Sequence, residues 1–174
     1  FLNQKKVTFD IFDENYISGQ KSKKSNANFI SRKEITSYEN FFVSPGFKIS
    51  SLPLKEISHS SRFFSDIDLF FNENRSFKIG ITGTNGKSSF TNYLNQALNS
   101  VSSSIALGNY GNPLPENVNH CHKYSVIELS SFQLEKMLNN KLDIAVLLDI
   151  TIDHLDYHES EENYRLSKLK IFPS

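Results

Sequence analysis

The sequence predicts an α/β protein, with a small Rossmann-like N-terminal domain followed by a mostly parallel, doubly wound sheet of the P-loop type. The first observation is a series of short apolar runs after residue 74 that alternate with helix-like segments. Runs that are apolar throughout are typical of parallel strands covered by helices on both faces. The second observation is a glycine-rich turn at 83–86, which lies between the first of these runs and a helix-like segment.

The strands and helices of the second half follow from these patterns. We expect strands at 77–82, 104–107, 124–129 and 143–150, and helices at 87–99, 131–139 and 161–171. Strands that alternate with helices form a mostly parallel sheet, in which the carboxyl ends of the strands lie at one edge. Because open α/β sheets bind ligands outside that edge, we expect the functional residues there.

The first half of the chain carries weaker signals. Its pattern predicts a strand at 6–15, a polar basic loop at 17–29, a short strand within 40–46 that Pro45 and Gly46 stop, and a helix around 52–59. Asn and Glu residues around position 73 indicate a linker. The sequence therefore predicts an N-terminal domain at 1–73 and a second domain at 74–174.

Composition excludes several classes of function. Nineteen basic residues balance nineteen acidic ones, so no net field favours nucleic acid or an anionic membrane, and a charged ligand must be held locally. The single cysteine, Cys121, excludes an internal disulfide and suits a reducing compartment. The longest apolar run, 144–152, is too short to span a bilayer, and no apolar signal segment opens the chain. We expect a soluble cytoplasmic protein.

The stretch "KIGITGTNGKSS" at 78–89 is the strongest motif. Backbone N–H groups from Thr84 to Lys87 could surround phosphate oxygens, because glycines at 83 and 86 permit the turn. Lys87 would meet the terminal phosphates, and the hydroxyl of Ser88 would bind Mg²⁺. Ile81 stands where the full consensus has a glycine, so this is a shortened variant. The alternative is an ordinary glycine turn between strand and helix.

Three further motifs follow the other predicted strands. Glu128 ends a buried strand, where a carboxylate could hold a metal, although Ser130 or Ser131 could simply cap a helix. Asp153 and His154 could reach a second metal, or could lie in a solvated turn. "GNYGNP" at 108–113 presents Asn109 in a tight turn, or is a simple strand exit. Lys168 and Lys170 have the pattern of ordinary solvated residues.

Taken together, these motifs resemble those of the Mur ligase family, most closely its D-glutamate-adding branch. The matching stretches are "GITGTNGKSS", "GNYGNP", "ELSSFQLE", "DHLDYH" and "NYRLSKLKIF", with "VSPG" and "SDIDLF" resembling the family's N-terminal domain. The resemblance implies an ATP-dependent amide ligase of peptidoglycan precursor synthesis. Such an enzyme adds D-glutamate to UDP-N-acetylmuramoyl-L-alanine through an acyl phosphate, with ATP and two Mg²⁺ ions.

The resemblance also implies roles for individual residues. ATP would be held by Gly83, Thr84, Asn85, Gly86, Lys87, Ser88 and Ser89. Glu128 with Ser88 would bind the first Mg²⁺, and His154 the second. Lys168 matches the family's lysine that CO₂ carbamylates to give another carboxylate near the metals, which requires a depressed pKa. The catalytic set would be Lys87, His154 and Lys168.

The muramoyl substrate would contact further residues. The resemblance implies Asn109, Ser130 and His154 at the muramoyl portion, Ser44, Pro45 and Gly46 along the UDP portion, and Asp13 near the uracil, with Asp10 as a substitute. The family's first strand, the rest of its ATP domain and its third domain have no counterpart here, so we expect an incomplete, inactive fragment. Asp149 replaces the usual asparagine. A non-catalytic nucleotide-binding fragment and another ligase of the Mur and folylpolyglutamate synthase group remain alternatives.

Overall fold

The computed structural model describes residues 2, 6–13, 15, 19, 21–22, 27–52, 55, 57–58 and 61–173. The chain divides into two compact units. The first comprises Phe1–Val43 and Phe47–Phe63, and the second comprises Ser44–Gly46 and Phe64–Ser174. Each unit is described by itself below. Within the described residues, no helix has both the length and the apolar character needed to cross a membrane.

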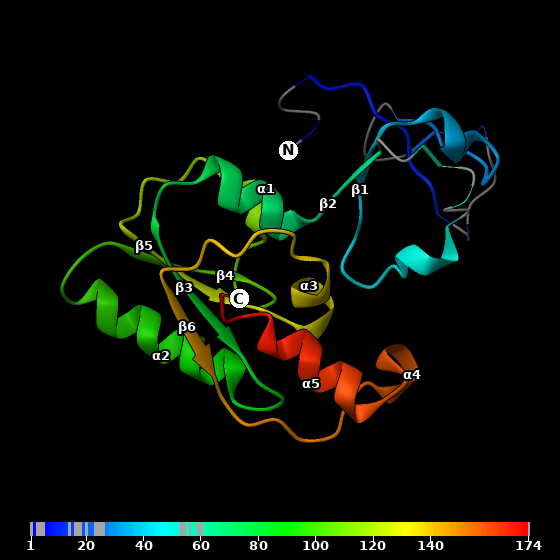
Figure 1. Ribbon diagram of the computed structural model, residues 1–174. Helices are drawn as coiled ribbons and strands as arrows, with labels where there is room; N and C mark the ends of the chain where they lie inside the picture. Colours follow the sequence, from blue (N-terminus) through cyan, green and yellow to red (C-terminus); the bar gives the residue numbers. More distant parts are fainter. Residues whose placement is uncertain are drawn as a thin grey trace. The chain divides into compact units, whose positions relative to one another are not determined.

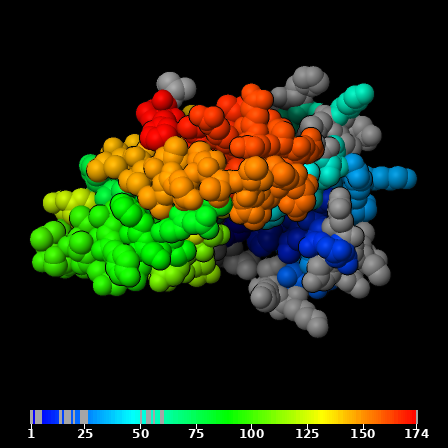
Figure 2. Space-filling view, turned by 90° about the horizontal axis from the view of Figure 1, so that it is seen from below, coloured from blue at the N-terminus to red at the C-terminus, as the bar shows by residue number. Residues whose placement is uncertain are grey.

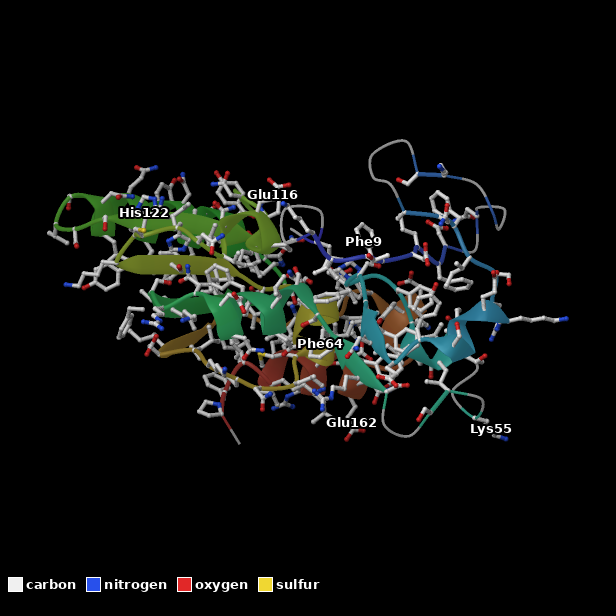
Figure 3. The ribbon with its side chains drawn as sticks, turned by 90° about the horizontal axis from the view of Figure 1, so that it is seen from above. Phe9, Lys55, Phe64, Glu116, His122 and Glu162 are labelled. Carbon is white, nitrogen blue, oxygen red and sulfur yellow. The ribbon has the colours of Figure 1, made fainter. Side chains whose placement is uncertain are left out.

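The second unit is built on a four-stranded parallel sheet, as the sequence predicts. Its strands are β3 (Phe77–Thr82), β4 (Ser104–Gly108), β5 (Tyr124–Glu128) and β6 (Ile144–Leu147), in the spatial order β4-β5-β3-β6. Glu128 lies in register with Ile81 on one side and Gly108 on the other, so these three strands end at the same edge. His122 lies just before β5, at the amino-terminal edge, and Figure 3 shows it well away from Glu162 of the last helix.

The helices of this unit cover both faces of the sheet. They are α1 (Asp66–Glu73), α2 (Lys87–Asn99), α3 (Ser131–Lys136), α4 (Leu155–His158) and α5 (Glu161–Leu169), with a 3-10 turn, η3 (Leu114–Asn117). The β3–α2–β4 and β5–α3–β6 crossovers run in opposite directions along the strand order. Right-handed crossovers therefore put α2 and α3 on opposite faces, and Figure 1 shows α2 on one side of the strands and α1 and α3 on the other.

Side chains with almost no solvent access form the core of the second unit. They include Ile81, Leu107, Val126, Ile127, Leu129, Leu134 and Ile171. Branched aliphatic residues suit strands that are buried on both faces, which explains why β3 and β5 can be predicted from the sequence. The sequence also predicts α2 with its observed bounds, whereas α3 ends at Lys136, three residues before the predicted end.

Helix α1 lies in the second unit and continues to Glu73, where the sequence suggests a linker. Ser65 and Asp68 form a reciprocal capping box at its start. The second carboxylate oxygen of Asp68 accepts a hydrogen bond of 2.9 Å from the backbone N–H of Leu138. The compact unit thus begins at Phe64, while the family's domain boundary near 73 stays a prediction.

The first unit contains two 3-10 turns, η1 (Glu34–Ser37) and η2 (Ile49–Ser51), and two short paired strands, β1 (Asn40–Phe42) and β2 (Arg62–Phe64), of which only Phe64 groups with the second unit. Its apolar cluster is centred on Ile35, Leu52 and Ile57. The strand predicted at 6–15 is absent from the described residues there, because Ile11 makes only an isolated bridge to Phe29. The predicted helix at 52–59 falls partly outside the described residues, and those described are not helical.

Replacing Gly108 by alanine tests how tightly β4 and β5 approach at the carboxyl edge. Gly108 has a φ of +98°, and a Cβ there would lie 2.2 Å from the carbonyl oxygen of Glu128. We expect Gly108→Ala to lower the free energy of unfolding by about 2 kcal/mol or more, measured by urea denaturation. Gly46→Ala is the control, because nothing lies within 4 Å of its added Cβ. Equal stability of the two variants would contradict this packing.

Candidate active site

The glycine-rich turn joins β3 to α2 with two special backbone positions. Gly83 has a φ of +156°, and a Cβ there would lie 2.7 Å from the Cβ of Leu148. Gly86 has a φ of +77° and is the N-cap of α2, with no side chain capping the helix. The first N–H groups of a 13-residue helix therefore lack a capping side chain, which is the arrangement that binds phosphate or other anions.

The turn is fastened to the segment that follows β6. The backbone N–H of Thr84 donates to the carbonyl of Asp149 at 2.8 Å, and the N–H of Asn85 donates to its carboxylate at 3.2 Å. The hydroxyl of Thr84 accepts a bond of 2.9 Å from the N–H of Thr151. Figure 2 shows the orange segment after β6 lying against the green segment of the turn and α2. The sequence predicts that the N–H groups of Thr84 and Asn85 face a phosphate; in this structure Asp149 accepts both, and the phosphate contact stays a prediction.

Lys87, Ser88 and Ser89 form the first turn of α2. The ammonium of Lys87 donates to the carbonyl of Thr84 at 2.8 Å, so the side chain folds back over the turn. The hydroxyl of Ser88 donates to a carboxylate oxygen of Glu128 at 2.8 Å. Ser89 is exposed. Lys87 and Ser88 thus lie where the sequence places them, at the mouth of the turn.

Glu128 is the centre of the site and is only 1% exposed. One carboxylate oxygen accepts the hydroxyl of Ser88, and the other accepts the side-chain amide of Asn109 at 2.9 Å. Both of these donors are neutral. A buried carboxylate is costly without compensation, so a cation beside it would be stabilised.

The donor atoms at this position suit Mg²⁺, which prefers oxygen ligands. The carboxylate of Glu128 and the hydroxyl of Ser88 lie within a hydrogen bond of each other. Among the described residues, no group of three or more His, Cys, Asp or Glu side chains could hold a metal. A magnesium ion here would therefore complete its shell with water and the phosphates of a nucleotide, as Mg²⁺ usually does.

Lys168 is buried, contrary to the solvated position that its pattern suggests. It is 2% exposed, its ammonium donates to the carbonyl of Gly83 at 2.7 Å, and it lies 4.7 Å from the ring centroid of Tyr164. Burial first, and then the like charge of Lys87, lower the pKa of Lys168 to about 8. Tyr164 in turn shares a hydrogen bond of 3.1 Å with the hydroxyl of Thr84. Two side chains of helix α5 thereby form hydrogen bonds with the glycine-rich turn.

Tyr164 is a site residue that the sequence reasoning missed. It lies four residues before Lys168, so both side chains lie on the same face of α5. That spacing is the signal that could have identified the pair. Asn109 was expected to contact the substrate, and its bond to the carboxylate of Glu128 was also not foreseen.

Among the described residues, no hydrogen bond, ion pair or ring contact joins His154 to Glu128. It is the N-cap of α4 with a left-handed φ of 51°, and its Nε2 atom lies 3.4 Å from the carboxylate of Asp153. Its ring packs 4.9 Å from that of Phe132, measured between centroids, and its side chain is 46% exposed. The metal and substrate roles of His154 stay predictions.

Ser130 and the 44–46 turn complete the predicted set in the second unit. Ser130 caps α3 through a reciprocal box with Gln133, so the capping alternative is confirmed for this serine. The carbonyl oxygen of Pro45 accepts a hydrogen bond from the ammonium of Lys136. Ser44 and Gly46 flank that contact in the sequence.

Two aspartates in the first unit were candidates for the uracil contact. The carboxylate of Asp10 accepts bonds from the hydroxyl of Tyr38 at 2.5 Å and from the backbone and side chain of Asn28. These bonds lower the pKa of Asp10, that from Tyr38 most strongly. The bond to Asp10, together with burial, raises the pKa of Tyr38 to about 12. Asp13 bonds only its near neighbour Asn15 among the described residues. The contact of Asp13 with the uracil stays a prediction.

Comparison with known proteins gives matches along most of the chain. The model of the Mur ligase middle domain matches residues 81–174. UDP-N-acetylmuramoylalanine--D-glutamate ligase of Wolbachia pipientis wMel is 40% identical over 167 residues, covering 91% of this chain and 32% of that protein. The proteins of the same name from Buchnera aphidicola subsp. Schizaphis graminum and Francisella philomiragia are 41% and 33% identical, covering 75% and 79% of this chain and 30% and 34% of theirs.

A solved structure also shares the fold. It is the MurF ligase of Thermotoga maritima in complex with ADP, with a TM-score of 0.50 and 18% identity. The match covers 98% of this chain and 42% of that one. The chain spans about a third of the length of the curated relatives that it matches.

Proposed function

Because the chain belongs to the Mur ligase family, we propose that the protein is an ATP-dependent ligase joining D-glutamate to UDP-N-acetylmuramoyl-L-alanine in peptidoglycan precursor synthesis. The names of the relatives at 33% to 41% identity support this choice of substrates. The observation that carries the proposal is the buried carboxylate of Glu128, bonded to Ser88 beside the uncapped start of α2. A cation and a phosphate chain would be stabilised together there.

The nucleotide would bind over the glycine-rich turn. The residues proposed to hold ATP are Gly83, Thr84, Asn85, Gly86, Lys87, Ser88 and Ser89. Lys87 contributes a positive charge at the start of α2, and its present acceptor is a single carbonyl of the turn. Asn85 can donate its N–H to a phosphate only after leaving the carboxylate of Asp149. Lys87 and the helix terminus would then balance the charge of the transferred group.

Ser88 and Glu128 would hold one magnesium ion, and His154 and a modified Lys168 would hold a second. When bound, Mg²⁺ neutralises charge on the phosphate oxygens. The chain's own residues would contribute by position: Glu128 fixes Ser88 and Asn109 at the strand ends. Asn109, Ser130 and His154 would orient the muramoyl portion, while Ser44, Pro45 and Gly46 would lie along the UDP portion and Asp13 near the uracil.

The proposed reaction has two transfers. A carboxylate oxygen of UDP-N-acetylmuramoyl-L-alanine attacks the γ-phosphorus of ATP, and the bond to ADP breaks. The amine of D-glutamate then attacks the carbonyl carbon of the acyl phosphate, loses a proton, and expels phosphate. Holding the three reactants in one geometry accounts for much of the rate in such transfers. We further propose that the protein works in the cytoplasm as a monomer, without nucleic acid or membrane partners.

A coupled assay tests the ligase function. With ATP, Mg²⁺, the muramoyl substrate and D-glutamate, we expect phosphate release that requires all four, measured on the product of the complete reading frame. Lys87→Met should lower turnover by about two orders of magnitude, as loss of one transition-state-stabilising group does. Lys170→Met, which changes the exposed C-cap residue of α5, is the control.

Other outcomes of that assay would favour the alternatives. ATP binding without phosphate release at saturating Mg²⁺ would indicate a non-catalytic nucleotide-binding protein. Thermal stabilisation by a folate and not by a UDP-sugar would indicate a folylpolyglutamate synthase. Normal turnover in Lys87→Met would show that this lysine does not contact the transferred group.

We also propose that Lys168 forms a carbamate with CO₂. Only the neutral amine reacts, and burial brings the pKa of Lys168 to about 8, so the neutral fraction is small at pH 6 and rises as the pH passes through 8. With ¹³C-bicarbonate, we expect a carbamate carbon signal at pH 8.5 that weakens at pH 6 and is lost in Lys168→Met. A signal unaffected by that substitution would place the modification elsewhere.

A further inference from the structure

Lys136, the last residue of α3, joins three separate segments of the second unit. Its side chain lies inside the protein, with 8% of the residue exposed. Its ammonium donates to the carbonyl oxygen of Pro45 and, at 3.0 Å, to the hydroxyl of Tyr157 in α4. The same nitrogen lies 5.5 Å from the centroid of the Tyr157 ring. One cation therefore contacts the 44–46 turn and α4 from the end of α3.

The 44–46 turn needs such a contact because of its place in the chain. Residues on both sides of it, up to Val43 and from Phe47 onward, belong to the first unit, whereas Ser44–Gly46 groups with the second. The three residues of this turn are in neither a strand nor a helix. Backbone without regular hydrogen bonds is held in place by side chains or by water. The bond from Lys136 is a side-chain contact of this kind.

The helix that carries Lys136 begins directly after residues of the proposed site. Glu128 and the cap residue Ser130 precede α3, which is six residues long, and His154 directly precedes α4. Moving the turn away from Lys136 would therefore change its spacing to the residues proposed to hold the muramoyl portion. A short helix with a capping box at its start is a firm support for that spacing.

Stability alone does not explain a cation at this position. Burial lowers the pKa of Lys136, while Glu135 and Asp66 partly oppose that effect. A buried ammonium is costly, and an apolar side chain of similar length would fill the same space at less cost. The ammonium adds what methionine lacks, namely directed hydrogen bonds to Pro45 and Tyr157.

We propose that Lys136 is a positioning residue for the UDP-linked substrate: it fixes the Ser44–Pro45–Gly46 turn against α3 and α4 through the Pro45 carbonyl. This inference rests on the proposed function, since it takes the turn to lie along the UDP portion. Lys136 acts through the backbone of the turn and touches neither the nucleotide nor the reacting atoms. Its loss should therefore weaken the binding of one substrate and spare that of the other.

The test compares two ligands on three variants, all made in the product of the complete reading frame. Titration calorimetry gives the Kd of UDP-N-acetylmuramoyl-L-alanine and of Mg·ATP for wild type, Lys136→Met, Lys136→Arg and Lys170→Met. We expect Lys136→Met to raise the Kd of the UDP-linked ligand about tenfold, the scale of one charge-assisted hydrogen bond, and that of ATP by less than about twofold. Lys136→Arg should recover most of the affinity. Lys170→Met is the matched control, because this lysine donates at 2.7 Å to a backbone carbonyl of α3, that of Glu135, but does not contact the turn.

Each remaining outcome has a defined meaning. An equal rise in both Kd values, or no rise in either, would overturn the positioning role while leaving the ligase proposal intact. Failure of the wild type to bind the UDP-linked ligand would instead overturn the proposed function, and this inference with it. If Lys136→Met does not fold, Lys136→Gln decides, because its shorter, uncharged side chain stays polar but loses the charge-assisted bond to Pro45. An unchanged Kd for the UDP-linked ligand in Lys136→Gln would then overturn the role.

Discussion

The carboxylate of Glu128 is the group on which the arrangement of the site depends. It lies at the end of β5, an interior strand between β4 and β3, and almost no solvent reaches it. A buried charge is stable only when hydrogen bonds or a cation compensate it. Here Ser88, at the start of α2, and Asn109, after the end of β4, donate hydrogen bonds to it. Residues that follow two other strands, β3 and β4, are thereby brought to one carboxylate at the end of β5, and its remaining charge favours a cation.

The glycine-rich turn is held in place by the segment that follows β6 and by helix α5. Gly83 allows close approach to Leu148, Asp149 accepts the N–H groups of two turn residues, and Lys168 donates to the Gly83 carbonyl from below. The turn is therefore held by backbone and side-chain contacts within the protein. Asp149 adds a negative charge beside the expected phosphates. An incoming nucleotide would compete with this carboxylate for the N–H of Asn85.

The sequence predicts the second unit well because its signals are local. Branched apolar runs identify the strands, and glycines 83 and 86 mark a turn whose φ angles require them. Lys168 and Lys136 could not be placed in this way, since their burial depends on packing between α5, α3 and distant segments. The strand predicted at 6–15 fails for a related reason. Alternating apolar and polar residues show that a segment could pair in a sheet. Among the described residues, however, Ile11 forms only a single isolated bridge.

Paramagnetic broadening by Mn²⁺ bound with ATP tests most directly whether Glu128 and Ser88 hold the nucleotide's cation. The account predicts that the side-chain amide of Asn109 and the backbone amide of Ser88 broaden first. His122, at the amino-terminal edge and labelled in Figure 3, should stay sharp. Glu128→Gln should abolish the selective effect. Broadening that is uniform, that begins at His122, or that persists in Glu128→Gln would contradict the account.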